Sequence, residues 1–325
     1  MTTAVHAGTT SRRPAWWWVR PAAAAATLAV LVWQLGTGPF LDGLRAVEGG
    51  ALAAASGLAG LTTVCCAWRW RIVARGLGIE LPLGTAVAAY YRSLFLNVTL
   101  PGGVVGDVHR GIRLGRDTSD VGRGLRAVAW ERAAGQAVQV VVTVALLLVL
   151  PSPVRAVVPP VALAVLAAAA GVALAIRARP ALGRVGGSRF SRLRRAVARD
   201  LRDGLLAGRA WAPIVLASAL VVAGHAVTFL IAARTAGVTA PPSQMVPLAL
   251  LVLLAAALPN VGGWGPREGV TAWAFAAAGL GASLGVATAV VYGVMVLVAT
   301  LPGAAVLLAG WVWRTRPAPW IERHA

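Results

Sequence analysis

The sequence predicts an all-α membrane protein, a polytopic bundle of about six full spans and two re-entrant helical hairpins. Of its 325 residues, 58% are hydrophobic and 13% are charged, and the mean hydropathy is +0.74. Soluble domains are nearer half apolar and a quarter charged. Apolar runs of about 20 residues, the length that a helix needs to cross a bilayer, recur along the chain. We therefore expect residues 1–325 to form a single transmembrane domain.

Six apolar segments are long enough to span a bilayer. They are Trp17–Leu35, Gly50–Trp68, Leu125–Leu150, Val157–Ile176, Trp211–Ala233 and Leu284–Trp313. Arg12 and Arg13 precede the first segment, as in a signal peptide, but Trp16–Trp18 resemble an interfacial belt. The sequence therefore favours an uncleaved first membrane helix.

The charge of the chain is strongly positive. The formal net charge is +19, and all 30 basic residues are arginine. No recognised nucleic-acid-binding motif accompanies them, so we expect no nucleic-acid partner. Arginine-rich and arginine-poor loops alternate between the apolar segments, which places both termini in the cytoplasm by the positive-inside tendency.

The longest polar loop, Ala178–Gly208, is expected to be a basic cytoplasmic loop within the domain. The stretch from Arg177 to Arg209 contains ten arginines, both end residues included. Apolar residues from Phe190 to Leu201 recur at helical spacing, with arginines on the other face. Two interpretations stay open, an amphipathic helix on the anionic inner leaflet and a solvated connector.

Two further apolar segments, Leu83–Gly111 and Met245–Gly279, are interrupted by prolines and glycines. The breaks contain Pro101, Gly102, Gly103 and Gly106 in the first segment, and Pro259, Gly263 and Gly265 in the second. Arg69, Arg71 and Arg75 follow the second span in a loop that is expected in the cytoplasm. Arg113, on the other flank of the first interrupted segment, is expected there too. The first segment is therefore expected to enter and leave from the cytoplasmic side, and the second from the outside.

Interrupted segments at corresponding positions of two halves point to a transporter binding site. Non-helical backbone at membrane depth is tolerated only beside protein or a water-filled cavity. The strings "LPGGVVGDVHRG" and "LPNVGGWGPREG" are weakly similar, which is compatible with an inverted repeat. The alternative is that all eight segments simply cross the membrane.

Charged side chains at membrane depth are costly and mark candidate sites. Arg267 and Glu268 follow the second break, and Pro266 suits the first turn of a new helix. A helix N-terminus with an arginine suits a phosphate, although a purely structural Arg–Glu pair is the alternative. Asp107 and Arg110 are three residues apart and share a helix face, where they either contact a headgroup or hold the hairpin closed.

Polar residues also mark the third and fifth spans. Glu131 lies only ~9 Å in from Leu125 at 1.5 Å per residue, so snorkelling can satisfy Glu131 and Arg132. Further polar residues follow at helical spacing, namely Gln136 and Gln139 on the third span and Ser218, His225 and Thr228 on the fifth. These stripes either line one cavity or join neighbouring helices by hydrogen bonds.

No motif of a soluble enzyme is visible. The chain has no Walker A loop, GxSxG elbow or HExxH pair, so we expect neither catalysis nor a cofactor. Cys65 and Cys66 are adjacent and have no other cysteine as a partner, so they are expected to pack as small apolar residues. A metal site is not expected.

Three ordered motifs resemble the lysylphosphatidylglycerol synthase membrane-domain family, which is also described as flippase-like. The stretch "SLFLNVTLPGGVVGDVHRGIRL" is similar to its Ser-x-x-x-Asn-x-x-x-Pro-Gly-Gly-x-Gly-Asp-x-x-Arg region. The stretch "AVAWERAAG" is similar to its Glu-Arg motif, and "LPNVGGWGPREG" to its Pro-x-x-x-Gly-x-Gly-x-Arg-Glu motif. The best-known member is the membrane half of the multiple peptide resistance factor.

The resemblance implies a multi-pass protein of a bacterial cytoplasmic membrane that moves a lipid between leaflets. The lipid would be anionic, aminoacylated or glycosylated. The implied headgroup set is Asn97, Asp107, Arg110, Glu131, Arg132, Arg267 and Glu268. The residues after Trp320 are too few for the soluble aminoacyl-transferring half, so we expect the membrane half alone.

The expected partners are the lipid, the membrane and a separate lipid synthase or glycosyltransferase, while the oligomeric state stays open. Two other classes of function are compatible with the sequence. One is an intramembrane lipid-modifying transferase, or an accessory subunit of a lipid-linked pathway. The other is a non-transporting scaffold, in which the charged pairs only hold the hairpins closed.

Overall fold

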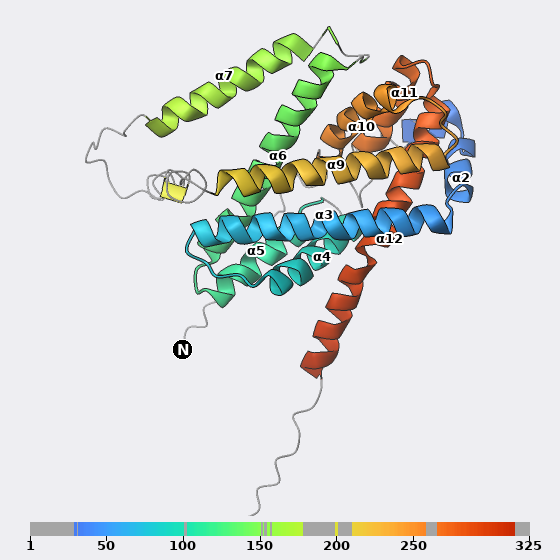
Figure 1. The fold of residues 1–325 in the computed structure, drawn as a ribbon. Helices are drawn as coiled ribbons and strands as arrows, with labels where there is room; N and C mark the ends of the chain where they lie inside the picture. The colour runs from blue at the N-terminus through green and yellow to red at the C-terminus, as the bar shows by residue number, and fades with distance from the viewer. Residues whose placement is uncertain are drawn as a thin grey trace, which may run out of the picture.

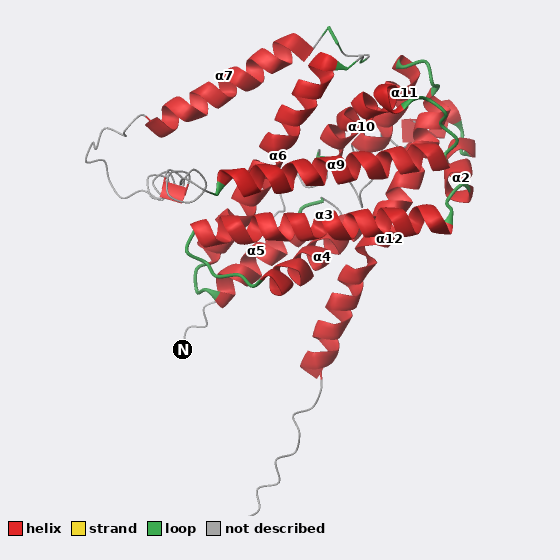
Figure 2. Ribbon diagram, in the orientation of Figure 1, coloured by secondary structure: helices red, strands yellow, loops and turns green. Residues whose placement is uncertain are grey.

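The protein is helical throughout the part of the chain that a computed structural model describes, with short loops and turns between the helices (Figure 1, Figure 2). The described residues are 29–30, 32–100, 103–150, 152, 155–156, 158–177, 199–200, 210–257 and 265–315. The all-α prediction is therefore confirmed over these ranges.

Four long helices are long and apolar enough to cross a membrane. They are α3 (Gly49–Gly76), α6 (Val121–Val149), α9 (Trp211–Thr235) and α12 (Ala282–Thr315). Four of the six predicted spans are thereby confirmed as candidate membrane helices. Helix α3 continues eight residues beyond the predicted end at Trp68, because no proline or glycine stops it before Gly76. Arg69 therefore lies inside a helix, whereas the sequence interpretation placed it in a cytoplasmic loop.

The two other predicted spans are less completely described. Segment Val157–Ile176 forms α7 (Val158–Arg177), a 20-residue helix that packs beside α6 at the edge of the bundle (Figure 1). Most of Trp17–Leu35 lies outside the described residues, as does the basic loop Ala178–Gly208 except for residues 199–200. A short helix that was not predicted, α2 (Gly38–Arg45), packs against α12.

Each interrupted segment forms a pair of short helices. The first gives α4 (Leu83–Thr99) and α5 (Val105–Asp117), and the second gives α10 (Pro242–Ala256) and α11 (Pro266–Ala277). Their lengths of 17, 13, 15 and 12 residues are below the roughly 20 residues that span a bilayer. The predicted interruptions are therefore confirmed, while re-entrance itself stays a prediction.

Two glycines of the breaks adopt backbone conformations that other residues disfavour. Gly103 and Gly265 have φ angles of 65° and 125°, in the region that glycine enters without steric cost. The remaining break residues, Pro101, Gly102, Pro259 and Gly263, lie outside the described residues. Helix α11 begins at Pro266, as the sequence predicts.

Two hydrophobic cores lie in the two halves of the chain. In the first half, Trp70 of α3 and Tyr90 of α4 pack with Ala127 of α6. In the second half, Phe229 of α9 packs edge to face against Phe275 of α11, with ring centroids 6.4 Å apart. Helices α3 and α9 pack against each other and join the two halves.

Candidate functional site

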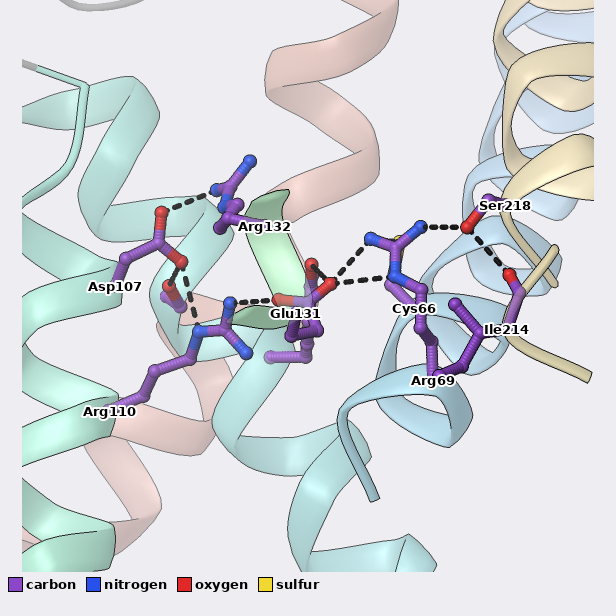
Figure 3. Close-up of polar contacts among 10 residues, drawn as sticks. Cys66, Arg69, Asp107, Arg110, Glu131, Arg132, Ile214 and Ser218 are labelled. Atoms are coloured by element: carbon purple, nitrogen blue, oxygen red, sulfur yellow. Dashed lines mark hydrogen bonds and ion pairs between the residues drawn. The ribbon is translucent and has the colours of Figure 1, made fainter. Parts of the chain in front are cut away.

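Glu131 of α6 is the centre of a buried network of ion pairs (Figure 3). Its Oε2 accepts a hydrogen bond from Arg110 Nη2 at 2.6 Å, and its Oε1 accepts from Arg69 Nε at 3.0 Å and from the Tyr90 hydroxyl at 3.1 Å. Its side chain is 0% exposed. The snorkelling interpretation is therefore wrong for Glu131, because three neighbouring helices cover the carboxylate and supply its donors.

Asp107 of α5 forms the second node of the network. Its Oδ1 accepts hydrogen bonds from Arg110 Nε at 2.9 Å and from the Ser93 hydroxyl at 3.0 Å. Its Oδ2 accepts from Arg132 Nη2 at 2.5 Å and from Asn97 Nδ2 at 3.1 Å. Arg110 thus joins the two carboxylates, and Asp107 and Arg110 share a helix face, as their spacing predicts.

A close approach between α4 and α5 makes this arrangement possible. Gly106 has no room for a side chain, since a Cβ there would lie 2.0 Å from the Ser93 carbonyl oxygen. Its backbone N–H donates to Asn97 Oδ1 at 2.8 Å, while the amide nitrogen of Asn97 donates to Asp107. Asn97 and Ser93 therefore fix Asp107 by tying the two helices of the hairpin together.

Two aromatic rings flank the guanidinium of Arg110. Its carbon lies 4.6 Å from the ring centroid of Trp70 and 4.3 Å from that of Tyr90, within the range of cation–π attraction. Arg110 is 1% exposed. Its role in the described structure is therefore to hold Glu131 and Asp107 together inside the protein.

A cavity of about 250 Å³ lies beside the network, between the two halves of the chain. Arg69 and Arg132 line it, and the Arg132 side chain is 40% exposed although it binds Asp107. The ends of α4 and α10 next to the two breaks also contribute to the wall, through Val98 and Ala257 among others. The two interrupted segments therefore reach the same cavity.

The polar stripes of the third and fifth spans both face this cavity. Its lining includes Gln136, Gln139, Ser218, His225 and Thr228. The hypothesis that the stripes line one cavity is therefore confirmed. Ser218 also accepts a hydrogen bond from Arg69 Nη1 at 3.0 Å, which links α9 to the network on α3.

Arg267 and Glu268 form a separate ion pair at the start of α11. Glu268 is 0% exposed, and its Oε2 accepts the backbone N–H of Gly265 at 2.6 Å, which caps the helix. The anion at this N-terminus is therefore the protein's own carboxylate. Arg267 lies 5.3 Å from the ring centroid of Tyr292, and that ring lines the cavity.

Three contributors to the site were not predicted from the sequence. Arg69 was interpreted as a loop residue, and Tyr90 and Ser93 received no role of their own. No local signal singled out Arg69, because it lies among arginines that mark the cytoplasmic side, and its burial follows only from the continuation of α3 to Gly76. Glu131 needed cationic partners at membrane depth, and Arg69 and Arg110 are those partners.

Metal binding has no geometric support in this region. Within the described ranges, no cluster of His, Cys, Asp and Glu side chains is arranged to hold an ion. Cys65 and Cys66 are both free and buried, and Cys66 Sγ lies 3.8 Å from Arg69 Nη2. The network therefore consists of arginines, carboxylates and neutral donors.

Residues 17–303 match the family model described as lysylphosphatidylglycerol synthase TM region. A comparison with curated proteins gives no match. The matched range contains both carboxylate nodes, the Arg267–Glu268 pair and the whole cavity lining. The resemblance that the three sequence motifs indicated is thereby confirmed, and with four candidate spans the chain is a multi-pass membrane protein.

Proposed function

The chain belongs to the lysylphosphatidylglycerol synthase TM region family, and on that premise we propose that it moves a lipid with an anionic headgroup between the leaflets of the membrane. The observation that carries this proposal is the cavity between the two halves, with two arginines on its wall. A cavity at the interface of two halves is where transporter folds bind their cargo.

The arginines are suited to receive a phosphate. A guanidinium presents a fork of donors that matches phosphate oxygens. Arg69 is held by Glu131 and Ser218, and Arg132 is held by Asp107. Both guanidinium groups are therefore already ordered before the lipid binds. Preorganisation of this kind reduces the entropy cost of binding. The acyl chains stay in the surrounding lipid while the headgroup enters.

The remaining residues of the headgroup set would hold the binding residues and the hairpins in place and would not contact the lipid themselves. Asn97, Asp107, Arg110 and Glu131 orient the two cavity arginines and connect them to the first hairpin. Arg267 and Glu268 support the second hairpin and adjoin the cavity through Tyr292. Movement of one half against the other would expose the cavity to each leaflet in turn.

The proposal includes an orientation in the membrane. The hairpin α4–α5 enters and leaves from the cytoplasm, the hairpin α10–α11 enters and leaves from the outside, and both termini are cytoplasmic. The order long helix, short pair, long helix occurs twice, as α3 to α6 and as α9 to α12. This order supports an inverted repeat of the kind found in transporters.

The test is lipid transfer in proteoliposomes that contain the purified full chain. Fluorescent phosphatidylglycerol labelled on an acyl chain reports transfer when dithionite bleaches the outer leaflet. We expect Arg132→Gln to abolish transfer while the folded yield stays near that of the parent protein, because the Arg132 side chain is 40% exposed and lines the cavity. The matched control is Arg116→Gln, an exposed arginine in the last turn of α5. A parental transfer rate in Arg132→Gln would sink the proposal.

A second candidate function is a non-transporting scaffold. It is favoured by the ion pair between Arg267 and Glu268 and by the cap that Glu268 provides for its own helix. In that case Arg267→Gln would lower the folded yield, and no lipid would change leaflet with the parent protein. A lipid-modifying activity would instead appear as a covalent change of the lipid, which mass spectrometry of the extracted vesicles detects.

A further inference from the structure

The charge of the cavity wall has one sign. Arg69 and Arg132 are the charged side chains among the described residues that line it, and no Asp or Glu takes part. His225 also lines the wall and contributes no negative charge; its Nδ1 lies 3.4 Å from the Tyr292 hydroxyl. A headgroup in the cavity therefore meets two guanidinium groups and, among the described lining residues, no carboxylate with which to pair an ammonium group.

The carboxylates nearest the cavity already have cationic partners. Both oxygens of Asp107 and both oxygens of Glu131 accept from arginines, and Glu268 binds Arg267. All three carboxylates are buried, and none of them is among the described residues that line the cavity. The other acidic residues of the described chain are absent from the lining; they are Asp42, Glu48, Glu80, Asp117, Asp120 and Asp200.

The aromatic rings of the wall are also engaged by cations. A ligand ammonium group could bind the face of an aromatic ring in place of a carboxylate. Tyr90 and Tyr292 are the tyrosines of the described lining. The ring of Tyr90 has Arg110 at 4.3 Å, and that of Tyr292 has Arg267 at 5.3 Å. A further cation beside either ring would also face a guanidinium of like charge.

The rest of the polar lining is neutral and accepts hydrogen bonds. It comprises Thr62, Thr63, Gln136, Gln139, Ser218, Thr228 and Thr300. The hydroxyls of Thr62, Thr228 and Thr300 donate to backbone carbonyls of their own helices, so their oxygens stay available as acceptors. Glutamine side chains both donate and accept. Such a wall suits the hydroxyl groups of a glycerol or a sugar.

From this lining, and resting on the proposed function, we infer that the cavity selects phospholipids whose headgroup carries a phosphate and is otherwise neutral and rich in hydroxyls. Headgroups with a free ammonium group, such as a lysine ester of phosphatidylglycerol, are disfavoured. The phosphate binds Arg69 and Arg132, and the hydroxyls bind the threonine and glutamine side chains. A buried ammonium group without a counter-charge is costly, and like charges side by side add to that cost.

Two measurements with the full chain test the selectivity. The first is transfer in phosphatidylcholine vesicles that carry acyl-labelled phosphatidylglycerol or acyl-labelled lysyl-phosphatidylglycerol. The second is competitive retention of the same two lipids by the purified protein, read by native mass spectrometry. We expect phosphatidylglycerol to be favoured by about tenfold or more in both, since like-charge contacts disfavour the wrong ligand strongly. Equal or greater transfer and retention of the lysyl lipid would overturn the inference.

A charge variant reports on the cavity directly. Gln139→Glu adds a carboxylate to the wall, and we expect it to reduce the retention ratio by about tenfold, through a new ammonium partner. Gln34→Glu adds the same charge at an exposed position outside the cavity and is the matched control. Should Gln139→Glu fail to fold, Gln136→Glu places the charge on the same face. A ratio unchanged in the cavity variant contradicts the inference.

The two proposals fail in different ways. If neither lipid changes leaflet, the proposed transport is wrong, and the retention ratio still decides the selectivity. If both lipids move at the same rate and are retained equally, transport stands and the selectivity is wrong.

Discussion

Arg110 on α5 and Glu131 on α6 lie in direct contact, with Nη2 and Oε2 at 2.6 Å and both side chains 0% exposed. Both charges of such a pair are needed, because removal of one partner leaves the other charge buried and uncompensated. Glu131 has the further role of holding Arg69, so a single carboxylate fixes two arginines from two helices. The first hairpin and the long helices therefore share one electrostatic centre.

Replacing Glu131 by glutamine should destabilise the whole first half. The neutral amide cannot compensate Arg69 and Arg110, and breaking a buried pair costs about 3–5 kcal/mol of unfolding free energy. Thermal unfolding in detergent measures the loss, and Glu80→Gln, at an exposed site between α3 and α4, is the control. Equal stabilities of the two variants would show that the network contributes nothing to folding.

Gly106→Ala should separate α4 from α5. The added Cβ would overlap the Ser93 carbonyl oxygen, which is backbone and cannot move aside without shifting the helix. Overpacking of this kind costs about 1–3 kcal/mol. Gly84→Ala is the control in α4, since a Cβ there meets nothing within 4 Å, and it should raise stability by roughly 0.5–1 kcal/mol. Thermal unfolding separates the two, and a parental melting temperature for Gly106→Ala would contradict the close approach.

Gly135→Ala should affect lipid transfer more than stability. A Cβ at Gly135 would lie 2.8 Å from the guanidinium atoms of Arg69, which can move because they end a long side chain. The displaced Arg69 then presents the wrong geometry to a phosphate. The readouts are the proteoliposome transfer rate and the melting temperature, with Gly57→Ala as a control in open space. Unchanged transfer would remove Arg69 from the proposed binding site.

Cysteine labelling tests the opposite orientation of the two hairpins. Cys65 and Cys66 are first replaced by alanine, and single cysteines are then placed at Val104 or Val261. Val104 is 48% exposed and follows the first break, and Val261 lies in the second break, outside the described residues. We expect an impermeant maleimide to label Val104→Cys only from the cytoplasmic side and Val261→Cys only from the outside. Labelling of both from one side contradicts the inverted arrangement.

Much of the local structure could be predicted because its causes are local. Helices α4 and α10 end before the two predicted breaks, and Pro266 starts α11 at the expected residue. The spacing of Asp107 and Arg110 predicts that both lie on one helix face, and the structure places them there. Apolar length alone identified the four long helices.

The contacts between distant residues could not be predicted from the sequence. Arg69 and Glu131 are 62 residues apart, and the local sequence around either residue does not predict that the two are in contact. Arg69 also lies close in sequence to other arginines that indicate the cytoplasmic side. It was therefore interpreted as part of a basic loop and not as a partner of a buried carboxylate. The sequence left headgroup contact and structural pairing open for the carboxylates, and tertiary packing places an arginine of the protein against each of them.

Helix α12 packs against both halves of the chain, since it contacts α9 and α11 on one side and α3 and α4 on the other. At its crossing with α4, a Cβ on Gly303 would lie 2.2 Å from the carbonyl oxygen of Tyr91, and Pro302 immediately before it lacks the N–H of a normal helix turn. The two halves are therefore not independent rigid bodies, because the continuous helix α12 packs against both. A movement of one half relative to the other must either bend α12 at Pro302 or separate Gly303 from Tyr91.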